Sequence, residues 1–434
     1  MRPRWLWAFM IAMVLSAAAR AFGGGYEWGG FGGRSGSMGG AFIGLADDWT
    51  ANYWNPAGLA QLRGSEIGID LLSPHLTIRG SDSFANLPPS PETGRMYRFT
   101  HDVFINYTGM EPDRFDKTSS SSSFYHPSGL GGYYSLPWVT LGAAVYSPLG
   151  YYSDWDDTIP FGLGSIYARN YQELVIVATQ FSAAKEILPG LYAGAGASLL
   201  YDRLSRQSEK IVSGAGPLDY RYDFTMKNDG YGAEGTFGLL YEIVDWLSLG
   251  AVYRTGATVS LTGRTESSLT LMGLEESSAV TQKFRHPPTW GLGIAAQPLP
   301  GLMTVTADWQ RTDWSFYRTN VSFERDGILF QSESYDEDWL DSNRYRFGVE
   351  YLLSAVALRG GFMYDESPLP DKSVSSAHIP DVNRKAVSLG AGHQLTDNWR
   401  LDAMGAYAWG KRTAREEEFE QKIWALSLGS VYSF

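Results

Sequence analysis

Two adjacent carboxylates interrupt an apolar, glycine-rich stretch near the start of the chain. Residues 39–62 read GGAFIGLADDWTANYWNPAGLAQL, and the carboxylates are Asp47 and Asp48. Carboxylates in apolar surroundings need cations or hydrogen-bond donors, because an unpaired buried charge is costly. The stretch is too short to form a domain and too polar to span a membrane. The rest of the chain must therefore supply a wall around it.

The same stretch contains the signal for the start of a helix. Asn55 is a good N-cap, and Pro56 suits the first helical position because the N–H that proline lacks has no partner there. With Ala57 these residues predict a short helix, while Phe42 and Trp49 offer an apolar surface. On these residues alone a second interpretation stays open, in which the stretch is a capped surface turn with solvated aspartates.

An apolar run with a basic start precedes this stretch. Arg2 and Arg4 lead into the apolar residues 5–15, and the sequence Ala-Arg-Ala at 19–21 fits the small-x-small rule for cleavage. We interpret residues 1–21 as a secretory signal peptide and exclude them from the fold. A single membrane anchor is the alternative, but the run is short and ends in small residues.

The composition excludes several classes of protein. The chain of 434 residues has no cysteine, which excludes disulfides and metal sites with thiolate ligands. Its formal net charge is −12, whereas binding to nucleic acid needs a basic patch. After the signal peptide no apolar run reaches the roughly 18 residues of a spanning helix. The 49 glycines and the 14% of aromatic residues, beside only 19% charged residues, suit a transmembrane β-barrel.

The end of the chain alternates with a period of two, which predicts a strand. In KIWALSLGSVYSF, large apolar side chains fall on one face and small ones on the other, and the chain ends in an aromatic residue, as strands of outer-membrane barrels do. The large residues are Trp424, Leu426, Leu428, Tyr432 and Phe434. The preceding stretch, WRLDAMGAYAW, places Arg400 and Asp402 opposite its apolar face. A charge facing lipid at mid-membrane costs about 2–4 kcal/mol, so we expect both residues to face the lumen.

Similar stretches recur upstream, and they predict about fourteen strands. Counted back from the C-terminus, the connections alternate between long (410–421, 365–383) and short (396–398, 354–355). Outer-membrane barrels have short periplasmic turns and long outer loops, so this alternation supports the same fold.

The first strand is predicted near Ser65 to Leu72. Residues 80–135 contain several prolines and a serine run, and we interpret them as a long outer loop with a strand possible near Val103 to Tyr107. A barrel of this size is too wide for its own side chains to fill, so it either conducts water or is plugged. We therefore expect residues 64–434 to form an all-β transmembrane antiparallel barrel, and residues 22–63 to fold back inside it as a plug with short helices.

The stretch GRSGSMGGAFIGLADDWTANYWNPAGLA resembles the N-terminal hatch of the FadL/TodX family of outer-membrane hydrocarbon transporters. Further matches are HPPTWGLGIAAQP, DWQRTDWSFY, YRFGVEY with LRGGFMYDESPLPD, and IPDVNRKAVSLGAGHQL, in the order of the family. The resemblance covers nearly the whole mature chain, although residues 80–130 depart from the pattern. It implies a fourteen-stranded barrel plugged by the hatch, an outer hydrophobic groove, an inner pocket, and lateral exit of substrate at a kinked strand near the Asn-Pro-Ala triplet.

The resemblance also implies passive transport of hydrophobic molecules, either long-chain fatty acids or related hydrocarbons. It further implies a monomer in the bacterial outer membrane, surrounded by lipid and lipopolysaccharide and inserted by the barrel-assembly machinery, with neither cofactor nor nucleic acid. The alternative function is a FadL-like barrel with a structural, secretion or assembly role and no transport. The sequence does not distinguish fatty acids from aromatic hydrocarbons, because both need an apolar wall.

Three arginines are candidates for binding the carboxylate of an amphipathic acid. Arg254, Arg346 and Arg359 each lie opposite apolar residues in their strands, so all three are expected to face the lumen. A second interpretation stays open, in which they pair with Glu350 or with the two adjacent aspartates and hold the hatch. Phe42 and Trp49 are the apolar candidates for substrate binding.

Signals for an enzyme are poor. GAYAWGKR, residues 405–412, nearly fits a phosphate-binding loop, but Arg412 stands where Ser or Thr should hold magnesium. The six histidines form no HExxH motif, and no GxSxG motif is present. His286, ahead of two prolines, is interpreted as a turn residue. The sequence therefore predicts a transporter or a structural barrel and not an enzyme.

Overall fold

The computed structural model describes nine stretches of the chain. They are residues 30–82, 115–121, 126–148, 150–161, 164–214, 216–336, 338–374, 381–414 and 417–434. The predicted signal peptide and the strand predicted near Val103 to Tyr107 lie outside these residues.

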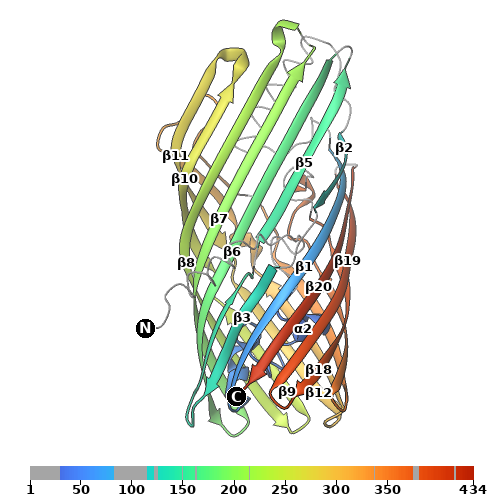
Figure 1. Cartoon of the computed structure of the whole chain (residues 1–434). Coiled ribbons are helices and arrows are strands. Elements are labelled where there is room, and N and C mark those ends of the chain that lie inside the picture. Colours follow the sequence, from blue (N-terminus) through green and yellow to red (C-terminus); the bar gives the residue numbers. More distant parts are fainter. Residues whose placement is uncertain are drawn as a thin grey trace.

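The described residues form a closed antiparallel β-barrel of 14 strands (Figure 1). Several barrel strands consist of two segments separated by an irregular residue or a short break. The segments are β1 (Ser65–Asp82), β2 (Phe115–Ser121), β3 (His126–Ser135), β4 (Thr140–Tyr146), β5 (Gly150–Phe161), β6 (Gly164–Leu188), β7 (Leu191–Ser213), β8 (Tyr220–Val244), β9 (Leu247–Arg254), β10 (Ala257–Leu269), β11 (Leu274–His286), β12 (Thr289–Leu299), β13 (Met303–Thr312), β14 (Arg318–Phe323), β15 (Glu333–Asp336), β16 (Ser342–Leu353), β17 (Val356–Asp365), β18 (Arg384–Thr396), β19 (Trp399–Ala414) and β20 (Glu417–Ser433).

Short helices lie at the N-terminus and in the connections. They are α2 (Gly33–Ser37), α3 (Ala51–Trp54), η1 (Pro56–Gln61), η3 (Gly216–Leu218), η4 (Thr270–Met272), η5 (Trp314–Phe316) and η6 (Asp371–Ser373). No helix among the described residues is long and apolar enough to cross a membrane.

The alternation of side chains along the last strands is confirmed. Trp424 and Leu428 of β20 are 59% and 52% exposed on the outer face, whereas Ser427 between them is buried. Asp402 of β19 is buried on the inner face, as expected for a charge that avoids lipid. Strand β20 pairs with β1, with Ile67 opposite Tyr432, and this pairing closes the barrel.

Two predicted loops are shorter than the sequence suggested. The predicted extent of the outer loop at 410–421 is wrong, because β19 and β20 continue as a paired ladder up to Ala414 and Glu417. Ala414 and Phe419 are buried on the inner face and keep the strands paired. The prediction of one long loop over residues 80–135 is wrong in its extent as well. Strand β1 begins at Ser65 as predicted but runs on to Asp82, and β2 and β3 occupy part of the rest.

The half of the barrel with the long connections has an apolar interior. Inward residues of β6, β8, β10 and β11 form one buried cluster with residues of the connections, including Phe224, Leu261, Trp314, Phe330 and Trp339. These connections fold onto the inner face of the wall. The short turns, the C-terminus and the N-terminal helices lie at the other end (Figure 1).

Candidate functional site

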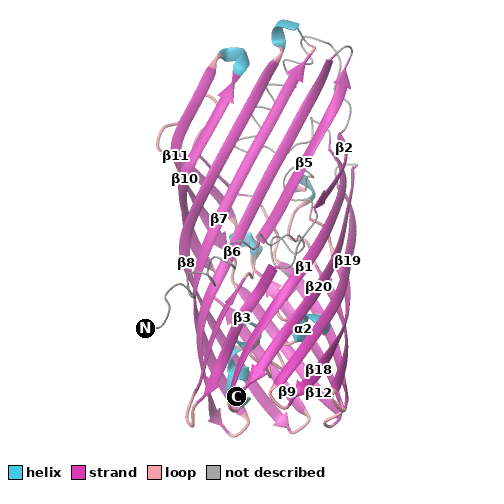
Figure 2. Ribbon diagram, viewed as in Figure 1, coloured by secondary structure: helices cyan, strands magenta, loops and turns pink. Residues whose placement is uncertain are grey.

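The N-terminal segment, residues 30–63, lies inside the barrel near the end with the short turns (Figure 2). Helix α2 contacts β17 to β20, and η1 contacts β6, β7 and β8. The wall approaches the backbone of the segment on both sides. A Cβ atom on Gly361 of β17 would lie 1.9 Å from the nitrogen of Gly39, and one on Gly250 of β9 would lie 2.1 Å from the oxygen of Ile43. Glycines in the wall thus make room for the segment.

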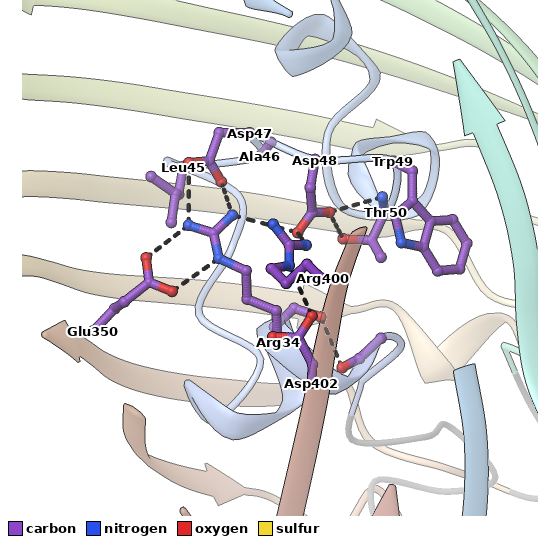
Figure 3. A network of polar contacts seen from close by, with 12 residues as sticks. Arg34, Leu45, Ala46, Asp47, Asp48, Trp49, Thr50, Glu350, Arg400 and Asp402 are labelled. Carbon is purple, nitrogen blue, oxygen red and sulfur yellow. Dashed lines mark hydrogen bonds and ion pairs between the residues drawn. The ribbon is translucent and has the colours of Figure 1, made fainter. Parts of the chain in front are cut away.

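One arginine of the segment joins both predicted aspartates to the wall. Arg34 donates to Asp47 at 2.6 Å and to Asp48 at 3.4 Å, and it makes a two-pronged contact with Glu350 of β16 at 2.8 and 2.9 Å (Figure 3). Its side chain is 11% exposed. A planar guanidinium suits this arrangement because its donors form a fixed fork. Arg34 was not predicted from the sequence. It lies in the segment and not in a strand, so no alternation of side chains marks it as facing inward.

The network extends along the wall through two further arginines. Arg359 of β17 donates to Glu350 and to Asp402 of β19, both at 2.5 Å. Arg400 donates to Asp402 at 2.9 Å and lies 3.9 Å from Asp48 (Figure 3). Three guanidinium groups therefore hold together the two carboxylates of the segment and the two of the wall, from β16 and β19. The pairing of Arg359 with Glu350 is the contact that the second interpretation of the sequence named.

The charge on Arg34 is maintained despite its burial. Burial disfavours the charged guanidinium, but the nearby carboxylates of Asp47 and Glu350 favour it more strongly, so the pKa of Arg34 lies well above its ordinary value. Arg34 therefore stays charged inside the barrel, where its carboxylate partners offset the cost of burial.

Asn55 caps η1 and also ties the segment to the barrel. Its Oδ1 accepts from the nitrogen of Ala57 at 3.2 Å, which confirms the predicted cap, and Pro56 occupies the first helical position. Its Nδ2 donates at 3.0 Å both to the oxygen of Ile43 and to the oxygen of Leu239 in β8. The side chain is fully buried, so each of these bonds is shielded from water.

Replacing Asn55 with alanine is expected to loosen η1. The loss of an N-cap costs about 0.5–2 kcal/mol, and the carbonyls of Ile43 and Leu239 also lose their donor. Amide hydrogen exchange in residues 56–61 should become faster while the barrel stays intact. The exposed Asn383, replaced by alanine, is the matched control. Unchanged exchange at 56–61 would show that the cap does not hold this helix.

A second carboxylate of the wall binds the segment through its backbone. Oδ2 of Asp308 in β13 accepts from the nitrogens of Phe42 and Ile43, at 2.6 and 2.8 Å. Asp308 is buried, and the two bonds fix the turn that precedes the adjacent aspartates. Only its position in the matched stretch DWQRTDWSFY could have singled it out.

The other two candidate arginines contact aromatic residues of the segment. Arg254 of β9 donates to the carbonyl oxygen of Tyr53 and lies 4.2 Å from the centre of its ring. Arg346 of β16 donates to Gln310 at 2.8 Å and lies 5.3 Å from the ring centre of Trp54. Both are buried and face the interior, where cation–π contact favours a guanidinium over an aromatic face.

An aromatic cluster lies between the segment and the wall. The ring of Phe31 is 5.1 Å from Trp49, 5.7 Å from Tyr53 and 5.3 Å from Tyr146 of β4, measured between ring centres. The same ring fills the space beside Gly129 of β3, where a Cβ atom would lie 1.7 Å from it. Phe31 therefore seals the segment against the second and third barrel strands.

Two cavities adjoin this cluster. The first, which we call the inner cavity, lies between α2 and the wall and holds about 830 Å³ of empty space including its mouth. Its lining is mainly apolar and includes Leu72, Pro74, Met363, Ala386, Met404 and Ile423, with Gly30 and Gly32 of the segment.

The second cavity, which we call the side cavity, holds about 460 Å³ of empty space including its mouth. It is lined by Tyr53, Tyr146, Pro148, Leu200, Glu234, Arg254, His286, Pro287 and Thr289. His286 is the last residue of β11 and not a turn residue. Its Nε2 lies 2.7 Å from Oδ2 of Asp202, and both side chains are buried.

The wall of the barrel is interrupted beside the side cavity. Strand β4 pairs with β3 as far as Gly129 opposite Tyr146, and β5 begins at Gly150. Among the described residues β5 has one paired neighbour, β6. The register on β6 shifts at the break: Tyr146 lies opposite Ala178, but Gly150 lies opposite Val175. Four steps on one strand match three on the other, so the third barrel strand accommodates one extra residue here.

Two prolines lie opposite one another where the ladder between β3 and β4 ends. The last bond between β3 and β4 runs from the nitrogen of Ser147 to the oxygen of Ser128 at 3.3 Å. The next step of the same register would place Pro148 opposite Pro127. Proline fixes φ near −65°, far from the roughly −140° of an antiparallel strand, so two opposed prolines disfavour a regular ladder at this step.

A comparison with protein families shows to which family this barrel belongs. The model of the outer membrane protein transport protein family (OMPP1/FadL/TodX) matches residues 16–429. The chain belongs to this family. It is therefore a β-barrel of the outer membrane.

Individual members of the FadL/TodX family are similar over shorter stretches or at low identity. The 47 kDa outer membrane protein of Pasteurella multocida is 26% identical over 44% of this chain and 47% of its own length. The long-chain fatty acid transport protein of Escherichia coli is 24% identical over 56% of this chain and 59% of its own length. The matches thus span about half of these relatives. The crystal structure of the Pseudomonas putida toluene transporter TodX superposes with a TM-score of 0.69, at 18% identity, and covers 94% of this chain and 99% of that one.

The structure places the residues that the sequence singled out in different surroundings. Asp47, Asp48 and Asn55 form bonds within the segment or to the wall. Phe42 and Trp49 are buried in the packing of the segment, and neither lines the inner or the side cavity. Of the three arginines that were candidates for substrate binding, Arg254 lines the side cavity and also binds Tyr53 of the segment. Arg346 lies over Trp54 of the segment, and Arg359 pairs with Glu350 and Asp402 of the wall.

Proposed function

We propose that this protein passively transports hydrophobic molecules across the outer membrane, with the N-terminal segment as a hatch and with lateral exit into the membrane. The observation that carries the proposal is the break in the wall between Tyr146 and Gly150, beside the side cavity and next to the hatch. A break in the ladder leaves backbone groups without a strand partner in the membrane, which is costly unless it serves a path.

A hydrophobic solute gains from such a path because it need not enter water again. The apolar interior of the outer half and the inner cavity offer surfaces on which apolar molecules are favoured over water. A straight pore would instead deliver the solute to the aqueous periplasm. The lateral route through the side cavity ends in lipid, where an apolar molecule is again favoured.

The substrates proposed are long-chain fatty acids or related hydrocarbons. One similar relative is named a long-chain fatty acid transport protein, and one similar structure is named a toluene transporter. Arg254 at the side cavity would bind the carboxylate of an acid during exit, since its guanidinium faces that cavity. Residues 22–63 would form the hatch, with Asp47, Asp48 and the triplet from Asn55 to Ala57 as the parts that hold it closed.

Phe31 would be the barrier between the two cavities. Its neighbours Gly30 and Gly32 line the inner cavity, and its ring contacts Tyr53 and Tyr146, which line the side cavity. Movement of this one ring would connect the cavities without unfolding the hatch. The proposal therefore predicts a gate of one side chain inside a hatch that stays anchored by its charges.

Replacing Phe31 with alanine is expected to raise the uptake of hydrophobic compounds several-fold. The change removes the ring between the cavities, at a cost of about 3–5 kcal/mol of packing free energy. Uptake of labelled oleate and toluene would be measured in a strain that lacks other transporters, beside the exposed Phe316→Ala as control. Unchanged uptake of both compounds would favour a barrel with a structural, secretion or assembly role.

A further inference from the structure

A polar cleft opens at the end of the barrel with the short turns, beside the root of the N-terminal segment. It lies between the link from β3 to β4 and the link from β6 to β7, and Arg63, Trp138, Thr140 and Lys185 are among its lining residues. Short turns of outer-membrane barrels face the periplasm. The cleft therefore lies at the level of the phospholipid head groups of the inner leaflet.

Two basic side chains of the cleft have no carboxylate partner within the stretches that the structure describes. Arg63 donates only to backbone oxygens, those of Ala60 and Leu62, both at 3.1 Å. Lys185 is exposed. Glu186 also lines the cleft, but its Oε1 accepts from the nitrogen of Gly190 at 3.0 Å and is thus engaged with its own turn. The lining of the cleft thus carries two basic side chains and one carboxylate, on a protein whose formal net charge is −12.

Apolar and aromatic side chains surround the cleft on the outer face of the barrel. Trp138 and Tyr134 are 68% and 59% exposed, and Ile187 and Leu188 beside Lys185 are 52% and 61% exposed. Tryptophan and tyrosine favour the boundary between head groups and acyl chains because one end of each ring is polar. The cleft thus combines cations for an anionic group with a surface for attached chains.

We propose that this cleft binds the phosphate of a phospholipid from the periplasmic leaflet. Arg63 and Lys185 would neutralise the phosphate, and Trp138 would lie against the glycerol and the first methylenes of the chains. The chemistry shared with free phosphate is the anion alone, and the exposed apolar side chains make the lipid the better ligand. The site is independent of the transport function, although it adjoins Gly64, where the segment joins β1.

The test uses the purified, folded full chain in detergent after removal of bound lipid. Phosphatidylglycerol, diacylglycerol without a phosphate, and soluble glycerol phosphate would each be added, and bound molecules counted by native mass spectrometry. The variant Arg63→Gln with Lys185→Gln should lose bound phosphatidylglycerol by about tenfold or more, since each basic residue near a lipid surface contributes to binding. The exposed pair Lys283→Gln with Arg325→Gln at the opposite end removes the same charge and should retain the lipid.

Three outcomes would overturn the proposal. The first is equal retention of phosphatidylglycerol by the cleft variant and by the control, both shown to be folded by their migration in unboiled gels. The second is retention of diacylglycerol as strong as that of phosphatidylglycerol. The third is binding of soluble glycerol phosphate as tight as that of the lipid. Trp138→Ala should weaken the binding of lipid and leave that of glycerol phosphate unchanged.

Discussion

Replacing Arg34 with methionine is expected to release the N-terminal segment and to open the barrel to ions. Arg34 is the member of the network that lies on the segment and binds the wall, through Glu350, while also pairing with Asp47 and Asp48. Methionine keeps much of the volume but donates nothing. Removing one partner of a buried ion pair costs about 3–5 kcal/mol, because the other charges stay buried without compensation.

The released state has two signatures that separate it from a protein that fails to fold. The variant should keep the faster migration of an unboiled barrel, while its conductance in a planar bilayer rises and its segment becomes open to protease. The exposed Arg264, replaced by methionine, is the matched control and should remain closed. A closed variant with a protease-resistant segment would show that the other contacts suffice to hold it.

The barrel itself was predictable from the sequence because its signal repeats. Each strand that crosses the membrane alternates apolar and polar residues, and a slip of one residue would turn every side chain to the wrong face. Arg359 and Asp402 were placed in the interior by this rule alone, and the structure pairs them at 2.5 Å. The cap at Asn55 was also predictable, because it depends on residues adjacent in the sequence.

The ends of the outer strands were not predictable by the same rule. Beyond the membrane the outer face carries polar residues, so acidic residues such as Glu417 and Glu418 indicate a loop, although the strands still pair there. What keeps them paired is the packing of inward residues such as Phe419 against the apolar interior of the outer half. That packing depends on connections far away in the sequence, including the one that contains Trp314.

The contact that anchors the segment and the break in the wall could not be predicted from the sequence, for a related reason. Arg34 and Glu350 are 316 positions apart in the sequence, and no local sequence pattern predicts that they form a pair. The extra residue between Tyr146 and Gly150 becomes visible only when the registers of β4 and β5 on β6 are compared. Phe31 likewise takes its place between two cavities from contacts with three different regions of the chain.

Deleting Pro148 is expected to close the wall and to abolish uptake of hydrophobic compounds. The third barrel strand carries one extra residue at this break, so removing one residue brings the pairing of β5 with β6 into the register of β4 with β6. The deletion also removes a residue that cannot donate a hydrogen bond. The ladder could then continue past Ser147, which would close the proposed exit from the side cavity to the membrane.

The control for this deletion keeps the extra residue. Pro148→Ala restores a donor but leaves the shift of register, so the wall should stay open and uptake should remain near that of the parent protein. Both variants should migrate as folded barrels in unboiled gels and should be as impermeable to ions as the parent, because the segment and its arginine network are untouched.

Uptake of labelled oleate and toluene by the Pro148 deletion, beside the parent and Pro148→Ala in matched strains, is the most direct test of lateral exit. Lateral exit predicts that uptake of both compounds falls to the level of a strain without the protein, while the folded amount in the outer membrane is unchanged. If the deletion variant took up both compounds at the rate of the parent although its wall is closed, lateral exit at this break would be contradicted. The exit would then lie elsewhere.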